Sequence, residues 1–231
     1  MKYQYLFIDN DDTLMDFSGS EYECIGKTLE HFGLDASHET RMTYNAINKS
    51  CWEAFDKGEI KREEIKPMRF TKLLKHLGAS HTAEDIDRFG EFYENSLGES
   101  AIWLEGAVDF LKNARKHLKI YIVTNGAAKI QRNRFKLVDM DDLVDGIVIS
   151  EEIGSRKPET EYFETAFKMA GCTDKSKAIM VGDTLTSDIQ GGLAAGVDTC
   201  LYDYRHNYDH IDSGAQFVAH SYEELNKILF G

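Results

Sequence analysis

The chain has 231 residues, of which 42% are hydrophobic and 29% are charged, a balance typical of soluble globular proteins. Lys and Arg number 27 and Asp and Glu number 40, so the formal net charge is −13. An acidic surface of this size argues against a nucleic-acid groove and against binding to anionic membranes, because both need clustered cations. An anionic small-molecule substrate would need a local cation to attract it.

The spacing of the cysteines and the hydropathy of the sequence argue against further classes of protein. The four cysteines are scattered without a Cys-x-x-Cys pair, which argues against a zinc ribbon. No apolar run approaches the roughly 18 residues that span a bilayer. The apolar segment at the beginning of the sequence is short and is followed at once by acidic residues, whereas a secretory signal has a longer apolar stretch. We therefore expect a cytoplasmic protein with reduced thiols and no nucleic-acid or membrane partner, and the sequence leaves open whether it is a monomer or a homodimer.

The first predicted element is a buried strand over residues 3–8, which ends in the polar run Asp9-Asn10-Asp11-Asp12-Thr13. From about residue 17 to residue 97, apolar residues recur at helical spacing in separate stripes, with glycines between them. This pattern predicts about four helices. The helical block therefore reads as an insertion that follows the first strand.

After residue 100 the pattern becomes an alternation of short apolar runs and amphipathic segments. We predict strands over 119–123, 146–149, 178–181 and 199–202, and helices over 127–137, 159–171, 187–195 and 221–230. Strands separated by helices predict parallel crossovers. The expected fold is α/β, a doubly wound, Rossmann-like parallel sheet formed by residues 1–16 and 99–231, with an inserted helical cap over residues 17–98.

Polar side chains follow three of the predicted strands, at the point where each strand ends. Asp9 and Asp11 follow the first strand, Thr124 follows the second, and Asp183 and Asp188 follow the strand over 178–181. Ligands of an open parallel sheet bind beyond the carboxyl ends of its strands. Crowded carboxylates repel one another unless a cation is present. A cluster of carboxylates without His or Cys favours a hard dication, most simply Mg²⁺.

These residues resemble the four motifs of the haloacid dehalogenase-like hydrolase superfamily. The matching segments, in chain order, are Asp9-x-Asp11-x-Thr13, Thr124, Lys157-Pro158 and Gly182-Asp183-x-x-x-x-Asp188. The helical insertion resembles the four-helix cap of that superfamily. Within this superfamily, the cap resembles that of bacterial pyrimidine 5′-nucleotidases at Tyr44, Asn48, Trp52, Gly58 and Arg69-Phe70. The segment 149–154, which lies outside the cap, resembles those enzymes as well.

The resemblance implies a Mg²⁺-dependent phosphomonoesterase that acts on a small phosphorylated metabolite, in particular a pyrimidine nucleoside monophosphate. Asp9 would be the nucleophile that forms an aspartyl-phosphate, and Asp11 the general acid and base. Lys157 would neutralise charge. The metal would be held by Asp9, the backbone carbonyl of Asp11, Asp183 and Asp188. Thr124 and nearby backbone N–H groups would bind the phosphoryl oxygens, at Asn10, Asn125 and Gly126.

Several residues also have a plain structural interpretation. Asp12 is expected to be solvated or to form a turn. Phe70 lies in an apolar stripe and is assigned to the core. Arg69 is most simply solvated or salt-bridged. Asn48 and Trp52 lie one helical turn apart, and we predict that this pair contacts the substrate.

Other functions remain open at this point. A sugar-phosphate phosphatase or phosphomutase of the same superfamily would use Asp9 and Asp11 as well. A haloacid dehalogenase is disfavoured, because that chemistry needs neither an acid at position 11 nor a metal. A non-enzymatic phospho-receiver also combines clustered aspartates with Thr and Lys, but it is usually shorter and lacks a helical insertion.

Overall fold

The structure is a computed structural model that describes residues 2–231. The chain divides into two compact units. One, the core unit, is formed by the residues up to Asp16 together with Ala101–Gly231. The other, the cap unit, is Phe17–Ser100. None of the described helices has the length and apolar composition needed to cross a membrane.

The core unit contains a six-stranded sheet with the order β3-β2-β1-β4-β5-β6, in which every neighbouring pair is parallel. Phe7 pairs with Tyr121 on one side and with Met180 on the other, so β1, β2 and β4 end at the same edge. The predicted α/β class with a parallel sheet is confirmed. The strands are β1 (Tyr5–Ile8), β2 (Lys119–Thr124), β3 (Gly146–Ile149), β4 (Ala178–Gly182), β5 (Asp198–Tyr202) and β6 (Phe217–Ala219).

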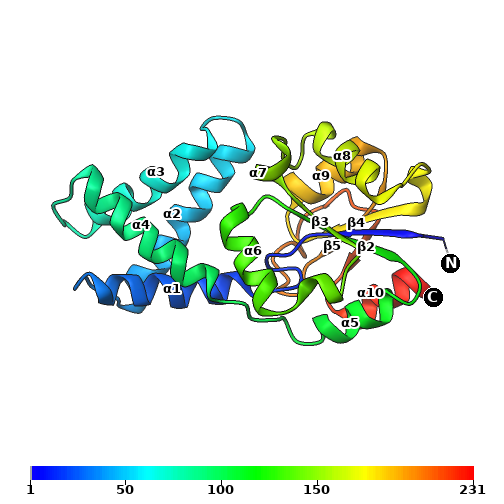
Figure 1. Cartoon of the computed structure of the whole chain (residues 1–231), viewed down its shortest axis with the longest axis horizontal. Helices are drawn as coiled ribbons and strands as arrows, with labels where there is room; N and C mark the ends of the chain where they lie inside the picture. Colours follow the sequence, from blue (N-terminus) through cyan, green and yellow to red (C-terminus); the bar gives the residue numbers. More distant parts are fainter. Residues whose placement is uncertain (1) are drawn as a thin grey trace. The chain divides into compact units, whose positions relative to one another are not determined.

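Helices lie on both faces of this sheet, as Figure 1 shows for α5 and α10 on one side and α8 and α9 on the other. The chain crosses between strands mostly through helices, which is how parallel strands are joined. The helices of the core unit are α5 (Ala107–Ala114), α6 (Ala128–Leu137), α7 (Ser150–Ile153), α8 (Thr160–Ala170), α9 (Gln190–Ala195) and α10 (Tyr222–Phe230).

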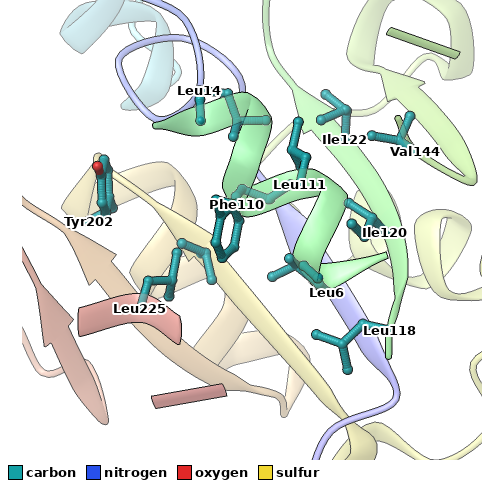
Figure 2. Close-up of a cluster of buried hydrophobic side chains, with 14 of the residues drawn as sticks. Leu6, Leu14, Phe110, Leu111, Leu118, Ile120, Ile122, Val144, Tyr202 and Leu225 are labelled. Atoms are coloured by element: carbon teal, nitrogen blue, oxygen red, sulfur yellow. The ribbon is translucent and has the colours of Figure 1, made fainter. Parts of the chain in front are cut away.

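Alternating side chains of the strands form two hydrophobic clusters. Leu6 and Ile8 belong to the cluster beneath α5 and α10, whereas Phe7 belongs to the cluster beneath α8. Figure 2 shows Phe110 and Leu111 of α5 among side chains of the strands and of α10. Because β1 is buried on both faces, its sequence is continuously apolar rather than alternating. This packing fixes the position of the loop that follows Ile8.

The cap unit consists of four helices, as predicted: α1 (Phe17–His31), α2 (His38–Asp56), α3 (Arg62–His76) and α4 (Ala83–Gly98). Thr82 begins α4 with a capping box, in which its hydroxyl accepts the Asp85 N–H and the Asp85 carboxylate accepts the Thr82 N–H. Aromatic rings fill the interior of the unit, with Tyr44 and Phe70 stacked at 5.9 Å. Phe70 is fully buried, which confirms its assignment to the core.

Local details differ from the predictions in several places. Helices α5 and α7 and strand β6 were not predicted. The predicted helix over 187–195 is a π-helical turn at Leu185–Ile189 followed by α9. At α10, Ser221 caps the helix as predicted, but the Glu224 carboxylate accepts the N–H of His220 rather than that of Ser221. The expected capping box is therefore incomplete.

Candidate active site

Three carboxylates meet at the edge where β1 and β4 end. The Asp9 N–H donates to the Val181 carbonyl at 2.9 Å, which continues the pairing of the two strands into the loop. Oxygens of Asp9, Asp183 and Asp188 lie within 4.8 Å of one another. Gly182 makes room for this cluster, because a Cβ there would lie 2.3 Å from a carboxylate oxygen of Asp188. The predicted convergence of distant acidic residues is present for Asp9, Asp183 and Asp188, but the carboxylate of Asp11 is not part of the group.

Lys157 supplies the positive charge within the cluster. Its buried Nζ lies 2.5 Å from Asp9 Oδ1 and 2.7 Å from Asp188 Oδ1, and it donates to the Val123 carbonyl at 2.9 Å. The side chain of Asn125 holds the Lys157 backbone on both sides, since it accepts the Lys157 N–H at 3.0 Å and donates to the Lys157 carbonyl at 2.9 Å. Asn125 therefore positions the lysine.

Burial dominates the electrostatics of these groups. It raises the pKa of Asp9 to about 7, with Lys157 opposing the shift and Asp188 and Asp11 adding to it. Burial also raises the pKa of Asp183 well above its usual range, and the charges of Asp9 and Asp188 reinforce this. For Lys157, burial alone would lower the pKa, but the carboxylates of Asp188 and Asp9 outweigh it and raise the pKa. The cluster thus holds more negative charge than one lysine balances.

The carboxylate of Asp11 lies apart from the other three, held by side chains of α6. Arg134 Nη1 lies 2.5 Å from Asp11 Oδ1, and Gln131 Nε2 donates to Asp11 Oδ2 at 2.8 Å. Gln131 Nε2 also donates to Thr124 Oγ1 at 2.9 Å. The sequence predictions missed both α6 residues. The available signal was their helical spacing, because Gln131 and Arg134 share a face with the buried Phe135.

The predicted phosphate-binding residues lie around the same loops, and their phosphate contacts remain a prediction. Thr124 is buried, and its hydroxyl accepts the Gly126 N–H at 3.0 Å. Asn10 is fully buried, and its Nδ2 donates to Asp11 Oδ1 at 2.8 Å. The Asn10 carbonyl accepts the N–H groups of Leu14 and Met15 and so closes the turn after β1.

A third cation, after Lys157 and Arg134, approaches the residues that follow β1 from the loop after β5. Arg205 Nη2 lies 3.3 Å from Asp12 Oδ1 and 3.0 Å from Asp16 Oδ1. Asp12 has a positive φ of 54°, a turn conformation that Asp tolerates. The expected turn role of Asp12 fits this geometry, whereas Arg205 was not singled out from the sequence.

The cap unit holds a buried polar network that the sequence predictions missed. Asn48 Nδ2 lies 2.5 Å from Glu21 Oε1, and Asn48 Oδ1 accepts from Arg69 Nη1 at 3.1 Å. Arg69 is buried, with Glu94 3.7 Å away, so the expectation of a solvated side chain is wrong and that of a salt bridge is right. The half-buried Trp52 packs with its ring 4.5 Å from the Arg62 guanidinium. Substrate contact by Asn48 and Trp52 stays a prediction.

The donor set of the acidic cluster fits a hard divalent cation. Asp9, Asp183 and Asp188 offer only oxygen ligands, and their mutual repulsion is incompletely balanced by Lys157. Such a cation would favour the ionised form of every carboxylate in the cluster. The Asp11 side chain is committed to Arg134 and Gln131, so a contribution from its backbone carbonyl remains the prediction for that residue.

Comparison with known proteins identifies relatives of this chain. The chain is 31% identical over 229 residues to the pyrimidine 5′-nucleotidase YjjG of Escherichia coli K12, with 99% of each chain covered. It is 32% identical to the HAD-hydrolase YfnB of Bacillus subtilis 168, covering 86% of this chain and 83% of the relative. The crystal structure of Bacillus subtilis YfnB bound to magnesium superposes with a TM-score of 0.90 at 30% identity, with 99% of both chains covered.

A third relative is the pyrimidine 5′-nucleotidase PynA of Streptococcus pneumoniae R6, at 29% identity over 97% of this chain and 94% of the relative. The model of the family described as haloacid dehalogenase-like hydrolase matches residues 6–202, which include all four motifs and the cap. The chain therefore belongs to the haloacid dehalogenase-like hydrolase family and is an enzyme.

Proposed function

We propose that this enzyme is a Mg²⁺-dependent phosphomonoesterase that works through an aspartyl-phosphate and acts on nucleoside monophosphates, with pyrimidine nucleotides preferred. The observation that carries the proposal is the meeting of Asp9, Asp183 and Asp188 around Lys157, with Asp11 held separately. The nucleotide preference draws on the two pyrimidine 5′-nucleotidases to which the chain is similar over almost its full length.

In the first step, an oxygen of the Asp9 carboxylate attacks the phosphorus of the ester. The bond between phosphorus and the leaving oxygen breaks, and Asp11 gives its proton to that oxygen, so that a neutral alcohol departs. Thr124 and the backbone N–H groups of its loop hold the phosphoryl oxygens during this transfer. Lys157 keeps the Asp9 carboxylate in place and offsets negative charge on the phosphoryl group.

In the second step, a water molecule attacks the phosphorus of the aspartyl-phosphate. Asp11, now a carboxylate, takes a proton from that water, and the bond between phosphorus and Asp9 breaks to release inorganic phosphate. When bound, Mg²⁺ supplies positive charge that screens the approach of the anionic nucleophile to the anionic ester. Asp9 and Asp11 thus act on different atoms of the ester, and Arg134 and Gln131 hold the Asp11 carboxylate apart from the acidic cluster.

The proposal is tested by phosphate release from a panel of esters, with Mg²⁺ and with EDTA. The panel contains UMP, dUMP, dTMP, purine monophosphates, sugar phosphates and phosphoglycolate. We expect Mg²⁺-dependent turnover with the highest kcat/KM on pyrimidine nucleotides. Activity confined to sugar phosphates or phosphoglycolate would remove the nucleotide assignment but keep the chemistry. Stoichiometric labelling without turnover would refute the chemistry.

A further inference from the structure

A second group of potential metal ligands lies outside the acidic cluster and shares no residue with it. His206 and Asp209 belong to the loop after β5, and His220 follows β6. Their ligand atoms all lie within 4.8 Å of one another. His206 Nδ1 is 3.0 Å from Asp209 Oδ2, a contact in which the ring N–H donates to the carboxylate, so a metal ion bound there would displace that proton. His220 Nε2 is 4.0 Å from Asp209 Oδ1. We propose that these three residues bind a transition-metal dication of the Zn²⁺ type.

His220 is oriented as a ligand. Its Nδ1 lies 2.8 Å from the backbone carbonyl of Asp203, a contact in which only the ring N–H can be the donor. Nδ1 therefore carries a proton, and in the neutral ring this leaves Nε2, on the side of Asp209, as the nitrogen that can bind a metal ion. Histidines that bind metals in proteins are commonly fixed in this way, with the second ring nitrogen donating to a carbonyl or carboxylate.

The loop that carries the other two ligands is fixed by a buried carboxylate. Asp203 is 3% exposed, and its two oxygens accept the N–H groups of Asn207 and Tyr208, each at 2.8 Å. These bonds shape the turn at His206, whose φ is 55°. The turn stacks the rings of His206 and His220 with centroids 4.3 Å apart and planes 10° from parallel. The fold therefore brings the two imidazoles together before any ion binds.

The chemistry of the three ligands selects the class of ion. Two imidazoles and one carboxylate are a common protein ligand set for Zn²⁺, whereas Mg²⁺ prefers oxygen ligands alone. Bonds of about 2.0–2.1 Å in a tetrahedron put neighbouring ligand atoms about 3.3 Å apart. The separations of 3.0 and 4.0 Å bracket that value, but the two stacked rings must rotate out of their parallel arrangement before both nitrogens point at one ion. The acidic cluster and this site should therefore take different ions.

A cavity adjoins the proposed site and leaves space for a fourth ligand. It has a volume of about 230 Å³ and is lined by Asp209 and His220, among other residues that include Asp203 and Tyr208. Three protein ligands with one open position are typical of zinc sites that bind water or a small anion. The cavity is therefore where the fourth ligand would enter.

The test is isothermal titration calorimetry with Zn²⁺ on the full chain, without a polyhistidine tag and in excess Mg²⁺. We expect one Zn²⁺ per chain, with affinity reduced at least about tenfold by His206→Ala and by His220→Ala. The matched control is His210→Ala, which removes an exposed histidine of the same loop and should leave Zn²⁺ binding unchanged.

A second variant separates this site from the acidic cluster. Asp183→Asn alters the acidic cluster and should keep the Zn²⁺ stoichiometry and affinity of the parent chain. Zn²⁺ binding that is lost in Asp183→Asn but kept in His206→Ala and His220→Ala would overturn the proposal. The absence of Zn²⁺ binding to the parent chain in excess Mg²⁺ would overturn it as well.

Discussion

Arg134 and Asp11 are 123 residues apart in sequence, yet Arg134 Nη1 lies 2.5 Å from Asp11 Oδ1. Arg134 is fully buried, whereas the Asp11 side chain remains 24% exposed. Gln131 connects the pair to Thr124, since its Nε2 donates to both Asp11 and the Thr124 hydroxyl. The proposed acid and base is thus held by a helix that begins just after the second motif.

We predict that Arg134→Met lowers kcat by about 10- to 100-fold, because the Asp11 carboxyl loses the group that fixes its position. Asp11→Asn should lower kcat by about 10²- to 10⁴-fold. If Arg134 acts through Asp11, adding Arg134→Met to Asp11→Asn should cause little further loss. The measurement is kcat for the two single variants and the double variant at saturating Mg²⁺.

Arg132→Met is the matched control, because Arg132 lies on the same helix but pairs with Glu152 at the surface, 2.6 Å away. It should leave kcat unchanged. Equal fold losses from Arg134→Met in the parent and in the Asp11→Asn background would show that Arg134 acts independently of Asp11, contrary to this prediction.

Replacement of the nucleophile gives a direct test of covalent catalysis. Asp9→Asn keeps the shape of the side chain but removes its nucleophilic oxygen, so kcat should fall by at least about 10³-fold. The fold should persist, because the backbone N–H of residue 9 still pairs with Val181. Phosphate release and circular dichroism check both statements. Hydrolysis near the parent rate, in protein free of parent enzyme, would refute the mechanism.

The raised pKa of Asp9 links Mg²⁺ binding to pH. With a pKa of about 7 in the folded chain against 3.8 for a free side chain, the folded state binds more protons between these values than the unfolded state. The free energy of unfolding contributed by Asp9 therefore falls as pH rises through that window. Mg²⁺ binds the ionised form, so its affinity should increase up to about tenfold per pH unit below pH 7.

The measurement is the Mg²⁺-induced increase in Tm at pH 5, 6, 7 and 8. We expect the increase to grow with pH, and Asp9→Asn should weaken the dependence without abolishing it, because the raised pKa of Asp183 remains. A Tm increase that is the same at pH 5 and pH 8 would be incompatible with proton competition at this carboxyl.

The sequence predictions were right for those strands and helices that depend only on local sequence patterns. Residues 3–8 form a short apolar run that is followed at once by acidic residues. A continuous apolar run of this length is typical of a strand that is buried on both faces of a parallel sheet. The order of strands and helices then brings Asp9 and Asp183 to one edge. The four cap helices followed from apolar stripes with a period of 3.6.

The missed features depend on contacts between distant residues. Arg134 and Gln131 look like ordinary polar residues of a surface helix until α6 packs beside the loop after β1. Arg69 looks solvated in sequence, because its partner Asn48 lies on a different helix. Strand β6 is only three residues long, too short to carry a period-2 signal.

The buried network of the cap gives a final prediction about stability. Arg69 lies 3.1 Å from Asn48 Oδ1 and 3.7 Å from Glu94, and its charge also interacts with Glu21. Arg69→Met should destabilise the chain by about 3–5 kcal/mol, because removing one partner of a buried ionic network leaves the others uncompensated. Lys66→Met removes the half-exposed partner of Glu94 and should cost less than about 1 kcal/mol. Urea denaturation measures both, and equal stability of the two variants would mean that the network adds nothing beyond surface pairing.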